Sequence, residues 1–328
     1  MSTVSIGRNP GNPMIRLILQ RVAISLGLLV AMSLLIFIGV EMLPGDVAQS
    51  ILGQSATPEA LANMRAELGL DRPAPQRYLE WLGGILQGDL GTSLSGGQDI
   101  ASMISGRFAN TMLLAGLAAL VSIPTAIGLG LLAVLYRDSW IDRTISLSTL
   151  TTISLPEYFI GYILIMVFSV WLGLLPSDAI VYRGMGLGER LISLVLPCVT
   201  LALVVIAHMM RMTRAALISV ISSPYVETAE LKGLRRGRIL TRHVLPNAIS
   251  PIITVVILNL AYLVVGVVVV EVVFVYPGMG QLLVDHVAKR DVPVVQAVGL
   301  IFAATYILLN LVADILAVAA NPRLRHPR

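Results

Sequence analysis

The chain has 328 residues, of which 56% are hydrophobic and 13% are charged. Soluble domains carry roughly 25% charged residues, so this composition excludes an ordinary water-soluble protein and favours one that crosses a membrane several times. The net charge of +4 fits the basic loops of such a protein better than a nucleic-acid surface. The single cysteine, Cys198, excludes a disulfide within the chain, and we interpret it as a small buried apolar residue.

Six apolar segments are long enough to cross a bilayer, which requires roughly 20 apolar residues. The first carries no charge and exceeds the roughly 7–15 residues of a secretory signal's apolar core, so we interpret it as a retained span. The predicted fold class is all-α, a polytopic membrane protein with six transmembrane helices. The six segments cover residues 22–40, 110–136, 147–172, 191–210, 247–270 and 294–317.

The distribution of Lys and Arg sets the predicted orientation, because cytoplasmic loops carry an excess of these residues. With the N-terminus inside, most of the 23 basic residues fall in cytoplasmic segments. Both termini are therefore expected in the cytoplasm. The predicted organisation is a cytoplasmic N-terminus (1–21), a first span (22–40), an outer helical loop (41–109), a permease-like core (110–320) that includes a cytoplasmic loop (211–246), and a cytoplasmic tail (321–328).

Two outer segments carry local structure signals. Thr57 is a suitable N-cap for a helix that begins at Pro58 and ends near Gly69. A second helix is expected over residues 75–86, which gives a small helical cap on the outer face. In the last outer loop, turn residues 276–280 precede a short amphipathic pattern, which predicts a segment that folds back at the membrane surface.

The basic insert between the fourth and fifth segments predicts a short helix. Ser222 or Ser223 can cap it, Pro224 can open it, and Gly233 can end it in a left-handed conformation. A second basic helix, residues 235–242, is expected to follow, and the fifth span is expected to begin near residue 246. Basic charge alone is typical of any cytoplasmic loop, so the spacing of particular residues must distinguish this one.

That spacing is informative. The chain reads Glu227-Thr228-Ala229, then Gly233, then His243-Val244-Leu245-Pro246. The pattern resembles the cytoplasmic "EAA" loop of permease subunits in binding-protein-dependent ABC importers, although Thr228 replaces its middle alanine. Further segments resemble the dipeptide, oligopeptide and nickel branch of that family, specifically the first of its two paired permeases, and these are residues 43–46, 57–59, 67–73, 88–93, 154–156, 276–280 and 290–296.

The resemblance implies an inner-membrane permease subunit that forms a translocation path for peptides or similar small solutes. Its implied partners are a homologous second permease, two ATP-binding subunits, an extracytoplasmic solute-binding protein and membrane lipid, but no nucleic acid. ATP and Mg would be bound by the ATPase partners. The cargo stays open among dipeptides, oligopeptides, nickel chelates, sugars and antibiotics. The residues implied to dock onto an ATPase are Tyr225, Glu227, Thr228, Ala229, Lys232, Gly233, His243, Leu245 and Pro246.

The sequence lacks the patterns of catalytic and metal sites. It has no Gly-x-x-x-x-Gly-Lys-Ser/Thr, the loop that cradles nucleotide phosphates, and no His-Glu-x-x-His or cluster of Cys and His. We therefore expect no ATP hydrolysis by this chain alone, and no cofactor, catalytic residue or metal in it. An intramembrane enzyme would lack a nucleophile here.

Acidic residues within apolar segments are costly and need a function or a partner. Glu157 in the third segment either lines the translocation path or makes a structural hydrogen bond. Asp314 is expected to pair with a cytoplasmic arginine, and His208 is interpreted as interfacial. The alternative function is a proton-coupled secondary transporter that uses Glu157 or Asp314 as its proton site.

Overall fold

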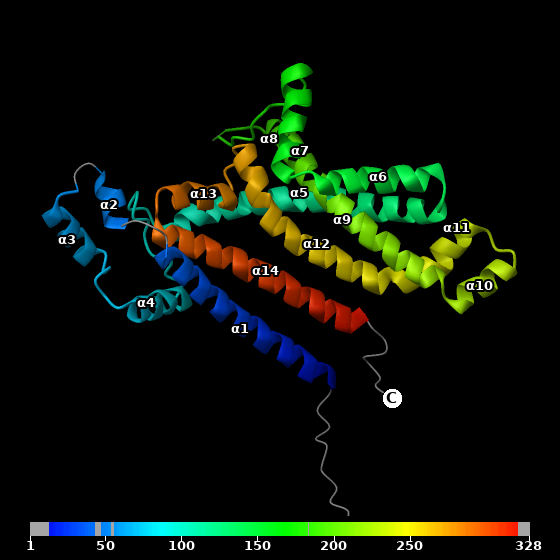
Figure 1. Ribbon diagram of the computed structural model, residues 1–328, viewed down its shortest axis with the longest axis horizontal. Coiled ribbons are helices and arrows are strands. Elements are labelled where there is room, and N and C mark those ends of the chain that lie inside the picture. Colours follow the sequence, from blue (N-terminus) through cyan, green and yellow to red (C-terminus); the bar gives the residue numbers. More distant parts are fainter. Residues whose placement is uncertain (1–12, 43–46, 54–55, 183, 321–328) are drawn as a thin grey trace, which may run out of the picture.

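The computed structural model describes residues 13–42, 47–53, 56–182 and 184–320. The family-like segment at 43–46 and the predicted tail at 321–328 lie outside these residues. Throughout the described part the structure is helical apart from one isolated bridge between Thr92 and Asp99, which confirms the all-α fold class. Five long helices run side by side along the long axis (Figure 1), and these are α1 (Pro13–Glu41), α5 (Ile100–Leu135), α9 (Val195–Ile221), α12 (Leu245–Val273) and α14 (Val292–Ala320).

The third predicted span is not the straight helix over 147–172 that the sequence suggests. It is split into α6 (Trp140–Ser154) and a second piece made of α7 (Glu157–Leu164) and the π-helical η2 (Ile165–Trp171), bent by 105°. Leu155 precedes Pro156 and is extended, with ψ 135°, because a proline ring disfavours the helical conformation of the residue before it. The described chain therefore has five helices that could span a membrane, or six if the bent pair counts as one.

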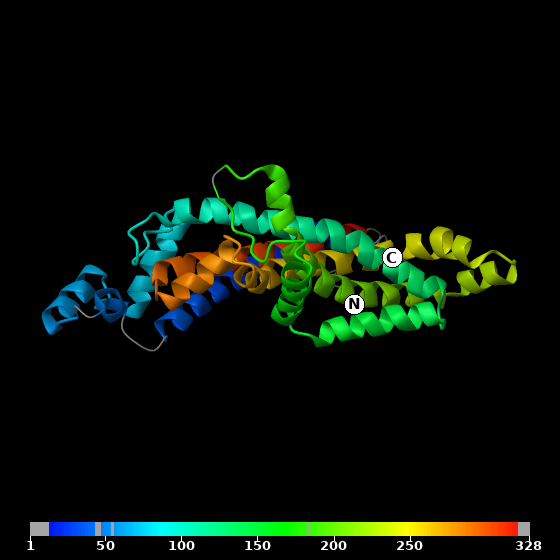
Figure 2. The ribbon, with the colours of Figure 1, turned by 90° about the horizontal axis from the view of Figure 1, so that it is seen from above.

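The second piece starts in the bundle, where α7 packs on α9 and α12, and then projects away from it as an arm (Figures 1 and 2). We use "arm" for residues 157–171. Its apolar side chains are largely exposed, including Tyr162, Val170 and Trp171. Such a surface requires lipid or another protein around it.

The helical bundle is packed around α9, which contacts α5, α6, α7 and α12. Leu201, Val205, Met209 and Met210 of α9 are fully or almost fully buried in the central cluster. Asp142 of α6 is 5% exposed and accepts two hydrogen bonds from Arg214 of α9, at 2.8 and 3.0 Å. This bidentate pair fixes α6 against α9 where the chain turns back.

The helical cap predicted for residues 41–109 is present at one end of the molecule (Figure 1). Thr57 caps α3 as expected, since its Oγ1 accepts from the Ala60 N–H at 3.2 Å. The rings of Tyr78 and Trp81 contact Phe37 of α1, with centroids 5.4 and 6.3 Å away. The cap comprises α2 (Val47–Leu52), α3 (Pro58–Glu67) and α4 (Ala74–Leu86), although the last ten residues of the predicted loop already belong to α5.

Asp291 ties residues 93–95, which follow the cap and which we call the cap segment, to the start of α14. Its carboxylate is 1% exposed and accepts from the backbone N–H groups of Leu94 and Ser95 and from the hydroxyls of Ser93 and Ser95. Burial disfavours the charged carboxylate, but these hydrogen bonds outweigh it and hold the pKa of Asp291 below its usual value. Two sequence motifs nearly 200 positions apart thus meet at one charge.

Glu271 organises the other outer loop, in which α13 (Met279–Ala288) is the predicted fold-back segment. Its carboxylate is fully buried and accepts from Thr111 Oγ1 at 2.6 Å and from the Gly280 N–H at 2.7 Å. A Cβ on Gly278 would overlap this carboxylate, and one on Gly280 would lie 2.5 Å from Val268 Cα. The glycines of the turn at 276–280 are therefore required by close packing on α12.

Gly280→Ala should destabilise the protein by about 1–3 kcal/mol, because the added methyl group meets backbone that cannot move aside cheaply. The matched control is Gly116→Ala in α5, where an added Cβ meets nothing within 4 Å. Thermal unfolding in detergent should show a lower midpoint for Gly280→Ala and no loss for the control. Equal midpoints for the two variants would contradict the packing argument.

Candidate functional site

The loop helix α10 (Pro224–Leu231) forms at the end of the molecule opposite the cap (Figure 1). Ser223 is extended at the N-cap, Pro224 is the first helical residue, and Gly233 has φ +73°, as expected. Ser223 Oγ does not cap the helix, since it donates to the Val220 carbonyl at 2.6 Å. The left-handed Gly233 turns the chain back toward the bundle, a conformation that glycine adopts at little cost.

One face of α10 packs on its own chain. Val226 is 1% exposed and Ala229 is 6% exposed. Ala229, which the sequence predicts to dock onto an ATPase, thus faces inward on its own chain. Its small size instead lets α10 lie close to the helices behind it, in a cluster with Val134, Leu217, Ile239, Leu240, Val244, Ala248 and Ile252.

The opposite face of α10 is open. Tyr225 is 45% exposed and Leu231 is 83% exposed, and both lie among polar exposed residues. Glu227, Thr228 and Lys232 are also exposed. Two large apolar side chains beside charged ones are typical of an interaction surface. We call the residues Tyr225, Glu227, Thr228, Leu231 and Lys232 the outward face of α10.

The second half of the loop differs from the prediction of a separate basic helix over 235–242. A short α11 (Arg236–Ile239) passes through one π-helical turn, η3 (Leu240–Val244), directly into α12. The Leu245 N–H bonds to the Leu240 carbonyl, five residues back. Pro246 follows and has no N–H to donate, so the wider turn lets the helix continue past it. The fifth spanning helix thus begins ten residues earlier than expected.

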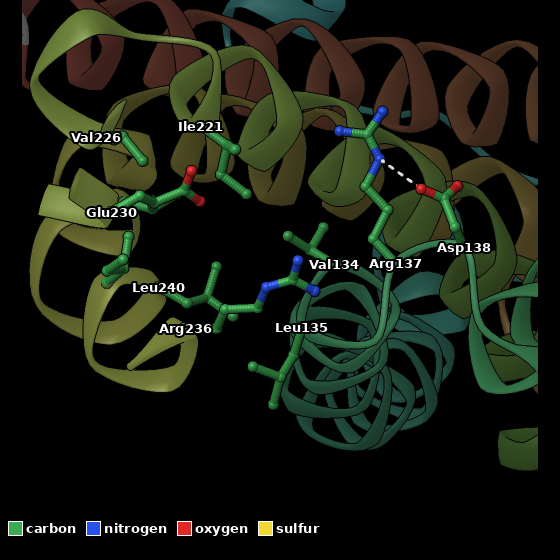
Figure 3. Close-up of a pocket in the computed structure, with 11 residues that line it drawn as sticks. Val134, Leu135, Arg137, Asp138, Ile221, Val226, Glu230, Arg236 and Leu240 are labelled. Carbon is green, nitrogen blue, oxygen red and sulfur yellow. Dashed lines mark ion pairs between the residues drawn. The ribbon is translucent and has the colours of Figure 1, made fainter. Parts of the chain in front are cut away.

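The remaining predicted loop residues lie at this junction. His243 and Leu245 are half-buried, and Pro246 is exposed. They do not lie on the outward face of α10, but they belong to the helix on which its inward face packs. A cavity of about 260 Å³ separates α10 from the end of α5, with Glu230 and Arg236 at its mouth (Figure 3). Helix α10 is seated mainly on α11 and α9.

A second polar site lies in the middle of the bundle. Glu157, the first residue of α7, accepts from the Tyr262 hydroxyl of α12 at 2.5 Å. The ring of His208 on α9, an exposed residue, lies 6.2 Å from that of Tyr262. Asp314 pairs with Arg21 at 2.9 Å, which confirms the expected arginine partner. Among the described residues, no group of three or more His, Cys, Asp or Glu could hold a metal ion.

Three residues that the structure places at important contacts were not predicted from the sequence. Glu271 and Asp291 were absent from the predicted site residues, and so was Leu231. The neighbouring glycines and serines could have indicated the first two, because backbone and hydroxyl donors gather around a buried carboxylate. Leu231 could have been found as an apolar residue on the polar face of a short helix.

Comparison with known proteins assigns the family. Residues 126–326 match the family described as "Binding-protein-dependent transport system inner membrane component", and residues 14–115 match its N-terminal companion family. The chain is 34% identical to the probable peptide ABC transporter permease protein y4tP of Sinorhizobium fredii, over 94% of this chain and 99% of that protein. It is 36% identical to the glutathione transport system permease protein GsiC of Escherichia coli O6:H1, over 95% of this chain and 100% of that protein. The chain therefore belongs to the family of binding-protein-dependent transport system inner membrane components, and it is a transmembrane permease subunit of an ABC importer, not itself an enzyme.

Proposed function

We propose that this chain forms half of the translocation path of an ATP-driven importer for peptides or similar small solutes. A homologous second permease completes the path, two ATP-binding subunits hold ATP and Mg, and an extracytoplasmic binding protein delivers the cargo. The outward face of α10 carries the proposal, because it offers exposed Tyr225 and Leu231 at the tip of the molecule. The relatives named for peptide and glutathione transport support the cargo class.

The loop can transmit a push from an ATPase to the bundle. Val226 and Ala229 pack the inward face of α10 in a cluster at α9 and α11, and α11 continues through η3 into α12. Helix α12 in turn carries Tyr262, next to Glu157, and Glu271, which holds the outer fold-back segment. A displacement of α10 therefore reaches both the middle and the outer end of the bundle through one helix. Coupling of this kind is reciprocal, so binding-protein docking would also favour ATP binding.

We infer that the α10 end is cytoplasmic and that both termini lie there. The basic bias of the sequence supports this orientation. The start of α1 and the end of α14 also lie toward the α10 end, whereas the cap lies at the other (Figure 1). The proton-coupled alternative has less support. Asp314 is already held by Arg21, and an ATPase-docking loop has no use in a proton-driven carrier.

The orientation predicts which residues a membrane-impermeant thiol reagent can reach in cells with a permeable outer layer and an intact inner membrane. In a Cys198→Ala background expressed without the ATPase subunits, Glu59→Cys on α3 should be labelled and Leu231→Cys on α10 should not. Both positions are exposed in the structure, so burial cannot explain a difference. After the inner membrane is opened, both should label. The reverse pattern in intact cells would overturn the proposed orientation.

The docking role predicts that Leu231→Asp lowers recovery of the ATPase subunits with the purified permease by about tenfold, since an interface centre rarely tolerates a new charge. The matched control is Leu187→Asp on α8 (Leu187–Ser193), whose leucine is 79% exposed far from the loop. Both variants should insert and unfold like the parent, because neither leucine is packed. Unchanged ATPase recovery with Leu231→Asp would leave the loop without a docking role.

A further inference from the structure

The acidic side chains of the spanning helices follow a rule with one exception in the described part of the chain. Four of them are paired with a cation or a backbone N–H group, and Glu157 is not. Its hydrogen bond comes from the Tyr262 hydroxyl, and no Lys, Arg or His of the described residues lies within ion-pair distance. The paired residues are Glu41 with Arg77, Asp142 with Arg214, Asp314 with Arg21, and Glu271 with the N–H groups of Gly280 and Gln281.

The position of Glu157 makes this exception costly. Tyr262 lies about 16 Å from the outer end of α12 at 1.5 Å per residue, so the carboxylate stands in the middle of the bundle. An ionised carboxylate at this depth needs an aqueous path or a positive partner. One hydroxyl satisfies one of its roughly four acceptor positions. The remaining positions are directed to whatever occupies the space in front of Glu157.

That space is a recess of about 280 Å³ whose remaining lining is aromatic or small. Tyr158 and Tyr262 are 51% and 39% exposed beside it, and Val265, Gly266 and Val269 complete it. A Cβ on Gly266 would lie 3.4 Å from both carboxylate oxygens, so glycine leaves this side of the recess open. A carboxylate flanked by two tyrosine rings combines charge pairing with cation–π attraction.

We propose that Glu157, Tyr262 and Tyr158 form a transit site for a primary ammonium group of the cargo, either a peptide α-amine or a lysine side chain. The proposal rests on the proposed function. A divalent metal would need several acidic or imidazole ligands, and this recess offers one carboxylate. An ammonium group needs only a few acceptors and gains from both rings.

The test uses the complete transporter in proteoliposomes, with both permeases, the ATPases and the binding protein. Two pairs of tripeptides serve as probes: Ala-Lys-Ala with its side-chain-acetylated form, and Ala-Ala-Ala with its N-acetylated form. The measured quantity is uptake by Glu157→Gln divided by uptake by the parent for the same peptide. This ratio cancels the selection that the binding protein exerts.

We expect the ratio to fall about tenfold for peptides that carry the recognised amine, because tenfold corresponds to the loss of one charge-assisted hydrogen bond. The ratio should stay near one for the peptide in which that amine is acetylated. A difference within the first pair identifies a lysine side chain, and one within the second identifies the α-amine. Glu157→Asp, which keeps the charge, should restore much of the selectivity. The matched control is Glu80→Gln, an exposed carboxylate of the cap, which should leave every ratio near one.

Three results would overturn the proposal. Equal losses for all four peptides would indicate a structural role for Glu157, and unchanged ratios would indicate no role. Loss of the second permease on purification of Glu157→Gln would assign the missing cation to that partner and not to cargo. A parent transporter that imports none of the peptides with ATP would instead contradict the proposed function, a failure that is visible before any variant is compared.

Discussion

A carboxylate buried among apolar helices is stable only with a partner, and the places where this chain supplies partners define its architecture. Asp142 fastens α6 to α9, and Asp314 fastens α14 to α1. Glu271 holds the outer fold-back segment against α12 and α5, and Asp291 holds the cap segment at the start of α14. These charges connect elements that hydrophobic packing alone would leave free to slide, since apolar helices in lipid gain little from one register over another.

The same helices connect the two ends of the molecule. Helix α12 continues without interruption from the π-helical turn next to α10 to the residue that positions the outer loop. Backbone hydrogen bonding along the helix continues past Pro246 because the preceding turn is a wide π-helical one. A rigid element that touches α10, Glu157 and the outer loop is the physical requirement for a permease whose inner and outer faces must respond to each other.

Local signals in the sequence predicted local structure well. Thr57, Pro224 and Gly233 each stand where the expected cap, first turn or left-handed end occurs, because these features depend on a few neighbouring residues. A proline in the sequence, Pro156, marks the position of the bend after Leu155. The angle of 105°, however, depends on packing against α9 and α12. The inward orientation of Ala229 likewise depends on distant residues such as Ala248 and Ile252. Periodicity cannot indicate which face of an eight-residue helix meets its own chain and which meets a partner.

The fastening of α14 at both ends has a mechanical consequence. Asp291 anchors its outer end to the cap segment, and Asp314, about 34 Å further along at 1.5 Å per residue, anchors its inner end to α1. Helix α14, held at both ends, can tilt, but rotation about its own axis would break the contacts of Asp291 or of Asp314. Helices α1 and α14 also pack along each other, and α1 carries the aromatic contacts of the cap. Force applied to the cap would thus move α1 and α14 together, and it would reach the α5, α9 and α12 core through the packing of α14 on α12.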